Sequence, residues 1–228
     1  MPNIPDCKLK LSYADNGNVA KLGTITDYSL SGENNNGTLY GDCYVDADGM
    51  HFDGTGDYIA AGDTNTTAFI QNTLVFTVAC WVYCDGLTQY FFCGSTVTAA
   101  EKGFRFGQVL DSGLKLQFRA MKGILATRVI TVQSTSFPYA DTSTYWKHIA
   151  VTGNGSSIAI YVDGESIPVT VVDAHSGYST GNSTRPVSIG ALTNFASNLL
   201  VGRMDGVHIV NRALSQPEIS QLYSRGRR

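Results

Sequence analysis

Leu74-Val-Phe-Thr-Val-Ala-Cys-Trp-Val-Tyr-Cys84 is the stretch that decides the fold class. Val75 to Val82 is apolar at nearly every position, so both faces of the strand that it forms must be buried. A strand of this kind belongs in the middle of a β-sandwich. Because Cys80 and Cys84 lie inside the strand, we expect buried thiols there rather than zinc ligands, which need paired positions on turns.

Apolar runs of strand length recur along the rest of the chain, with turn residues between them. Several alternate apolar and polar side chains, as Phe104 and Phe106 do, which is typical of a sheet with one solvent-exposed face. The clearest runs cover 49–53, 103–107, 113–119, 127–133, 146–152 and 157–163. The pattern predicts an all-β fold, a two-sheet antiparallel β-sandwich of the jelly-roll kind.

Composition agrees with a folded β domain. The 228 residues are 43% hydrophobic and 15% charged, which fits one domain over 1–228, with 1–21 as an N-terminal extension or first strand. Fifteen aspartates against four glutamates favour turns and strands over helices. The formal net charge of -3 leaves no basic surplus for phosphate binding, so we expect no nucleic-acid partner.

The amino terminus indicates where the chain is made. Met1-Pro-Asn-Ile-Pro-Asp-Cys-Lys8 has neither the basic start nor the apolar stretch of a secretory signal. No window reaches the length of a membrane span, so we expect no membrane insertion. The sequence therefore predicts synthesis in the cytosol without a signal peptide.

One short helix is expected at the C-terminal end, over residues 215–225. Ser215-Gln-Pro-Glu218 is a capping box, in which the serine hydroxyl and the glutamate side chain satisfy each other's backbone amides. The apolar face of this helix comprises Ile219, Leu222 and Tyr223. Gly226 then ends the helix, and Arg227-Arg228 is expected to be a solvated tip.

Six blocks occur in an order and at spacings that resemble a known family. They are Met50-His-Phe-Asp-Gly-Thr-Gly-Asp-Tyr-Ile59, Phe76-Thr-Val-Ala-Cys-Trp-Val82, Trp146-Lys-His-Ile-Ala-Val-Thr152, Ile160-Tyr-Val-Asp-Gly164, Ser188-Ile-Gly190 and Gly202-Arg-Met-Asp-Gly-Val-His-Ile-Val-Asn-Arg-Ala-Leu-Ser-Gln-Pro-Glu-Ile219. The series, over about residues 22–224, resembles the laminin G-like modules of the concanavalin A-like lectin/glucanase superfamily. The resemblance implies a sandwich of two large curved sheets.

Parts of these blocks also have a purely structural interpretation. Asp53-Gly-Thr-Gly56 and Asp163-Gly164 are expected to be turns, in which glycine adopts backbone angles that side chains disfavour. Trp81 and Trp146 each lie between apolar neighbours, so we expect both in the core.

The resemblance does not extend to catalysis. The β-glucanases of the superfamily carry Glu-x-Asp-x-x-Glu on one strand, which supplies the acid and the nucleophile of a retaining glycosidase. Here Glu33, Glu101, Glu165 and Glu218 lie far apart in the sequence, and the four histidines are scattered singly. We therefore expect a protein that is not an enzyme.

A structural calcium ion is the one cofactor that the resemblance implies. Many laminin G-like modules hold one ion between an early Asp/Asn-rich loop and a late aspartate, which here correspond to Asp27, Ser29, Asn35 and Asp205. Ser29 stands where the family has an aspartate, and Asp27 is displaced by two positions. The alternative is that these side chains cap turns through hydrogen bonds to the backbone.

Two loops have the composition of a carbohydrate site. An aromatic face that stacks on a sugar and polar groups that bind its hydroxyls are found at His175, Tyr178 and Asn182, and again at Tyr139 and Asp141. Such loops are also common as solvated connections.

These observations predict a non-catalytic recognition or assembly module. In the interpretation we favour, it is a structural protein of a virion or phage surface, a capsid decoration or tail-associated protein. Its partners are other copies of itself or shell proteins, and carbohydrate. A stand-alone calcium-dependent lectin is the alternative, and a polysaccharide-degrading glycosidase is a third interpretation.

Overall fold

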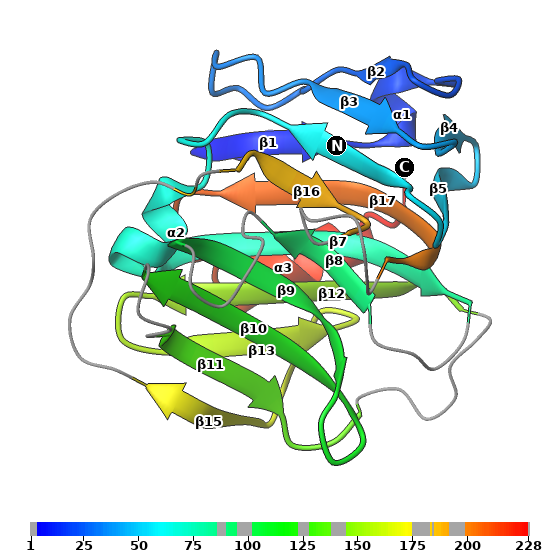
Figure 1. Ribbon diagram of the computed structural model, residues 1–228. Helices are drawn as coiled ribbons and strands as arrows, with labels where there is room; N and C mark the ends of the chain where they lie inside the picture. Colours follow the sequence, from blue (N-terminus) through cyan, green and yellow to red (C-terminus); the bar gives the residue numbers. More distant parts are fainter. Residues whose placement is uncertain are drawn as a thin grey trace.

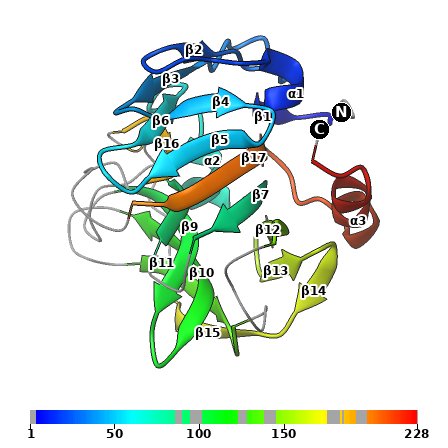
Figure 2. The same cartoon turned by 90° about the vertical axis from the view of Figure 1, so that its right-hand side faces the viewer.

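The computed structural model describes residues 4–85, 90–94, 102–122, 128–137, 145–174, 183, 185–191 and 199–227. Within them the chain forms two antiparallel sheets that pack face to face (Figures 1 and 2). Sheet A contains β1 (Cys7–Leu11), β4 (Tyr44–Asp46), β5 (Gly49–Asp53), β7 (Val75–Cys84), β12 (Lys147–Asn154), β13 (Ile158–Val162), β14 (Glu165–Ile167) and β17 (Val201–Val210). Sheet B contains β2 (Thr24–Ile25), β3 (Gly37–Tyr40), β6 (Tyr58–Ala61), β8 (Tyr90–Gly94), β9 (Lys102–Leu110), β10 (Leu114–Lys122), β11 (Arg128–Ser134), β15 (Val169–Ala174) and β16 (Val187–Ile189). The predicted all-β sandwich is confirmed.

The strand order places β7 at the centre of sheet A. That sheet runs β14-β13-β12-β7-β17-β5-β4, and β1 also pairs with β17. Sheet B runs β15-β11-β10-β9-β8-β16-β6-β3-β2. Strands that are distant in sequence therefore lie side by side, as β5 and β17 do through the pair Arg203 and His51.

The core lies between the two sheets and is rich in phenylalanine. Phe76 of β7 stacks on Phe118 of β10, with ring centroids 4.7 Å apart, and Phe104 of β9 packs against the same ring at 6.4 Å. All three side chains are fully buried. Each contributes about 1.5 to 3 kcal/mol by leaving water, and the contact of Phe76 with Phe118 holds sheet A against sheet B.

The outer face of sheet A is covered in part by a helix. Figure 2 shows α3 (Gln216–Ser224) outside this sheet, on the side away from sheet B. A second apolar cluster lies beneath it, formed by Ile4, Cys7, Ala79, Ala150, Tyr161, Val210, Leu214, Ile219 and Leu222. Thr77 of β7 links the strand to the chain before α3, because its hydroxyl donates to the Arg212 carbonyl and accepts from the Leu214 amide. As predicted, β7 is buried on both faces.

Local predictions at the C-terminal end and at the Asp163-Gly164 turn are confirmed. The capping box of Ser215 and Glu218 begins α3, and Gly226 follows the helix with a φ of 71°. Asp163 and Gly164 form the two-residue turn between β13 and β14, both with positive φ. All five cysteines are free and buried.

Two short helices were not predicted, α1 (Tyr13–Asn16) and α2 (Ala68–Thr73). Neither has an amphipathic repeat long enough to be visible in the sequence. Among the described residues, the structure contains no helix with the length and apolarity needed to cross a membrane.

The predicted core positions of Trp81 and Trp146 are wrong. On β7 the residues with even numbers face sheet B, so Trp81 faces outward, where its ring stacks on Tyr223 of α3 at 5.7 Å. Trp146 precedes β12 and also lies on the outer face, against Tyr83. A strand that is apolar on both sides does not reveal which side faces the core.

The C-terminal tip is also more structured than predicted. Arg227 lies over the Trp146 ring, 4.0 Å from its centroid, and donates a hydrogen bond to the Asp48 carbonyl. A guanidinium gains from the face of an indole, which explains why this residue is held on the sheet rather than solvated.

Two buried histidines lie between sheet A and α3. His148 and His208 line a cavity of about 10 Å³ together with Trp81 and Leu222. His208 Nδ1 is 2.7 Å from the Gly206 carbonyl oxygen, and Asp163, Lys10 and Asp15 are the charged groups nearby. Burial lowers the pKa of both imidazoles to about 4, and the charge of His208 adds to the effect at His148.

We predict that the protein loses stability between pH 7 and pH 5. The unfolded chain takes up protons below about pH 6.5, whereas the folded histidines do so only near pH 4, so the free energy of unfolding falls in this window. The expected loss is about 2 kcal/mol for each histidine. Urea unfolding of the wild type and of the double variant His148→Gln, His208→Gln at the two pH values measures it. Equal stability of the wild type at both values contradicts the prediction.

Candidate functional site

A pocket opens where β5 ends and β17 begins. Its volume is about 520 Å³. Strands β4, β5 and β17 and the turns after β3, β5 and β7 supply most of its walls, so residues far apart in sequence meet there. The lining residues are Lys21, Asp42, Tyr44, His51, Phe52, Asp53, Asp57, Asp85, Val201, Gly202 and Arg203.

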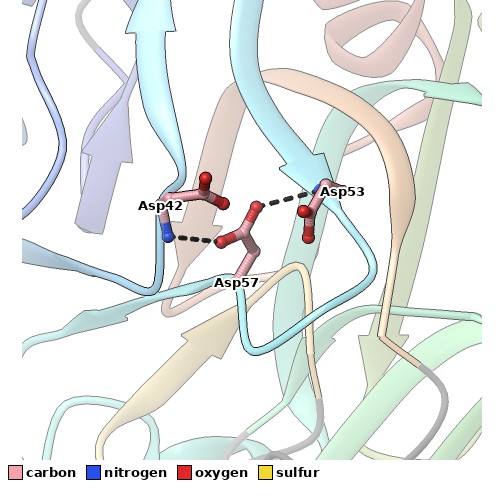
Figure 3. Close-up of side chains that lie close together, drawn as sticks. All are labelled: Asp42, Asp53 and Asp57. Carbon is pink, nitrogen blue, oxygen red and sulfur yellow. Dashed lines mark hydrogen bonds between the residues drawn. The ribbon is translucent and has the colours of Figure 1, made fainter.

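Three aspartates converge at one end of this pocket (Figure 3). Asp57 lies just before β6 and is only 2% exposed. Its carboxylate accepts hydrogen bonds from the Asp42 amide at 2.8 Å and from the Asp53 amide at 2.9 Å. It thereby ties the turn after β3 to the turn after β5. Gly54 and Gly56 allow the second turn, with φ values of 83° and 78°.

The pocket's aspartates have different electrostatic surroundings. Burial raises the pKa of Asp57, and the charges of Asp53 and Asp42 raise it further. The ammonium of Lys21 lies 2.9 Å from Asp42, and this hydrogen bond lowers the pKa of Asp42 and raises that of Lys21. The pocket therefore holds one buried carboxylate that is engaged by amides and one exposed carboxylate that is engaged by a lysine.

Aromatic and cationic groups form the other side of the pocket. The Tyr44 ring stacks on His51 at a centroid distance of 4.3 Å and is 40% exposed. His51 is in turn held by Asp46, whose carboxylate lies 2.7 Å from Nε2. The Arg203 guanidinium lies 4.0 Å from the Tyr83 ring centroid. Each of these groups is oriented by a neighbour.

The three carboxylates could in principle hold a cation, because Asp42, Asp53 and Asp57 offer oxygens within 4.8 Å of one another. Among the described residues they are the single group of this kind. Backbone amides already bind the Asp57 carboxylate, and Lys21 binds that of Asp42. The Asp53 carboxylate accepts from the Thr55 amide at 2.6 Å. Each of the three carboxylates therefore already has a hydrogen-bond or ion-pair partner within the protein.

The residues predicted to bind calcium lie in two places. Asp27, Ser29 and Asn35 are together, since the Asp27 carboxylate accepts from both Ser29 donors and from the Asn35 amide at 2.8 to 3.1 Å. Asp205 is 2% exposed and accepts instead from the amides of Tyr13 and Gly206. These bonds are the turn-capping contacts of the alternative interpretation, and the calcium site itself stays a prediction.

The predicted carbohydrate residues lie outside the described part of the chain. This holds for Tyr139, Asp141, His175, Tyr178 and Asn182. The pocket lined by Asp42, Tyr44 and Arg203 was not predicted. Asp53-Gly-Thr-Gly56 was visible in the sequence as a turn, but nothing in one sequence shows that the turn after β3 and the start of β17 meet it.

These features describe a pocket at one end of a two-sheet β-sandwich. No curated protein matches the chain by sequence. The family model described as the Concanavalin A-like lectin/glucanases superfamily (Laminin_G_3) matches residues 53–220. The chain belongs to this family, which confirms the resemblance noted in the sequence.

Solved structures with the same fold include several binding domains. The receptor binding domain of the botulinum neurotoxin C/D mosaic serotype has a TM-score of 0.66 at 15% identity, covering 97% of this chain and 51% of that one. The binding domain of Paraclostridial Mosquitocidal Protein 1 gives 0.65 at 17% identity, with 96% and 52% covered. This chain spans about half the length of those two domains.

A carbohydrate complex is also among the similar structures. Domain 4 of AbnA, a GH43 extracellular arabinanase from Geobacillus stearothermophilus, was solved with arabinotriose. Its TM-score is 0.59 at 13% identity, and the match covers 96% of this chain and 98% of that domain. At these identities the likeness is one of fold.

We predict that Asp57 holds the pocket together. Asp57→Ala removes the acceptor of two backbone amides, and leaving such donors without a partner costs about 1 to 3 kcal/mol. Asp42→Ala removes an exposed ion pair and is expected to change the free energy of unfolding little. Chemical unfolding of both variants measures the difference. The prediction fails if the two variants are equally stable.

Proposed function

We propose that this chain is a non-catalytic recognition module that binds saccharide in the pocket of Asp42, Asp53, Tyr44 and Arg203. One observation carries the proposal: an exposed, stacked aromatic ring lies in the same pocket as oriented carboxylates and a guanidinium. A sugar ring presents apolar C–H faces and hydroxyls that both donate and accept. The pocket offers a surface for the first and partners for the second.

The details of the pocket support binding rather than turnover. Both oxygens of Asp57 accept backbone amides, so this carboxylate is held as a structural acceptor. No glutamate is among the described residues that line the pocket.

Solved structures with a similar fold also support a binding function. One is named as the receptor binding domain of a botulinum neurotoxin, one as the binding domain of a mosquitocidal protein, and one was solved with arabinotriose. Arabinotriose is therefore a reasonable first ligand to test. A calcium requirement, through Asp27, Ser29, Asn35 and Asp205, is part of the proposal and is tested by adding a chelator.

We predict that Tyr44→Ala abolishes most saccharide binding and that Tyr40→Ala does not. The two tyrosines are matched, because each is 40% exposed and stacked on a neighbouring ring, Tyr58 in the case of Tyr40. Only Tyr44 lines the pocket. A glycan array followed by calorimetric titration, with arabinotriose included, measures the difference. No binding to any glycan, or equal loss in both variants, would falsify the proposal.

Assembly with other copies of the chain is a second candidate, and one observation favours it. β15 is the edge strand of sheet B, and its Val171 and Val172 are 55% and 47% exposed. An exposed apolar edge is a surface on which another strand can pair. A role on a virion surface, as capsid decoration or tail-associated protein, belongs to this candidate. Detection of the chain in purified particles tests that placement.

The second candidate predicts a solution mass that is a multiple of 24.5 kDa. Val171→Lys, which places a charge on the β15 edge, is then expected to return the protein to the mass of one chain. Light scattering behind size exclusion measures both. If the wild type is a monomer at micromolar concentration, the hypothesis of self-assembly through the β15 edge is excluded.

A further inference from the structure

A row of side chains continues from the pocket across the outer face of sheet A. We call it the aromatic-arginine strip, and it consists of Tyr44, His51, Arg203, Tyr83, Trp146 and Arg227. Most neighbouring members of the strip are in contact, and His51 and Arg203 are cross-strand partners. Tyr44 stacks on His51 at 4.3 Å, Arg203 lies over Tyr83 at 4.0 Å, and Tyr83 packs against Trp146 at 5.9 Å.

The sheet register makes this row continuous. Tyr44 pairs with His51, His51 with Arg203, and Arg203 with Tyr83, so one residue from each of four adjacent strands lies at the same level. Their sequence neighbours Met50, Met204 and Val82 are buried in the core, so the row faces outward. From Tyr44 to Trp146 the strip crosses four strand steps of about 4.8 Å each, roughly 19 Å.

The two arginines are fixed in position. Arg203 lies over Tyr83 and is 5.8 Å from the Trp146 centroid, and Arg227 lies over Trp146 at 4.0 Å. A guanidinium fixed against a ring presents its N–H donors at the edges of a flat surface. Because the side chains are already ordered, binding loses little conformational entropy.

Aspartates lie beside the polar groups of the strip. Asp48 lies 3.7 Å from Arg203, its carbonyl accepts from Arg227, and Asp46 contacts His51. A strongly anionic ligand meets these carboxylates, and those of the pocket, as well as the arginines. The charge pattern therefore favours a neutral, hydroxyl-rich ligand.

We propose that the ligand is a linear, neutral oligosaccharide that lies across the strands, with one sugar in the pocket and further sugars over Arg203 and over Arg227, which itself lies on the Trp146 ring. This proposal rests on the proposed function and specifies that the ligand is an oligosaccharide rather than a single sugar. Pocket and strip share Tyr44, His51 and Arg203, so one ligand contacts both. Arg227 forms the far end of the site.

The number of sugars in the ligand is the variable that tests this proposal. A series of one to six sugars in the arabinan, β-glucan, xylan and mannan backbones is titrated calorimetrically into wild type, Arg227→Ala, Trp146→Ala and Tyr40→Ala. Affinity of the wild type is expected to rise at least tenfold between the monosaccharide and the tetrasaccharide. Arg227→Ala and Trp146→Ala are expected to reduce that gain several-fold while leaving monosaccharide affinity unchanged. Tyr40→Ala is expected to behave as wild type.

The outcomes separate the two proposals. If affinity does not depend on the number of sugars, or if the gain in affinity persists in both Arg227→Ala and Trp146→Ala, the extended ligand is overturned. Saccharide binding in the pocket is still supported in that case. Absence of binding to every series overturns the proposed function together with it. Arg227 is the safer of the two substitutions, because it lies after α3 near the chain end, so its result stands even if Trp146→Ala fails to fold.

Discussion

Burial of β7 on both faces is the constraint on which the rest of the structure depends. Its inner face supplies Phe76 to the contact with sheet B, and its outer face packs beneath α3. A strand in this position has no freedom of register, because a slip of one residue would exchange the two faces. Thr77 fixes the outer side further, through hydrogen bonds to the chain that enters α3.

The same alternation that buries Phe76 determines what the outer face displays. Residues with even numbers on β7 face the core, so Trp81 and Tyr83 face outward. Near α3, the outward-facing side chains of β7 lie between sheet A and the helix, together with His148 and His208. Beyond the helix they join Arg203 and Trp146 on the open part of the sheet. Pocket and strip are thus products of the strand register, with side chains held by their neighbours rather than by a ligand.

Much of the fold could be predicted from the sequence, and the pocket could not. Alternating and fully apolar strands, the Asp163-Gly164 turn and the capping box at Ser215 are local signals, and local physics fixes them. The pocket depends on Asp57 reaching the amides of Asp42 and Asp53 across a turn. That contact follows from strand order, which composition and periodicity do not encode. The prediction that Trp81 and Trp146 lie in the core was wrong for a related reason. Apolar neighbours in the sequence indicate that a side chain is buried, but not which face of the sheet it lies on.

Under the proposed function, ligand binds where β5 ends and β17 begins, rather than at the residues around Tyr139 and Tyr178. Hydrogen exchange of the wild type, with and without the tightest glycan from an array, tests this most directly. The account predicts slower exchange in residues 42–57 and 200–205. Slower exchange confined to residues 138–144 and 175–184, with 42–57 unchanged, would contradict it.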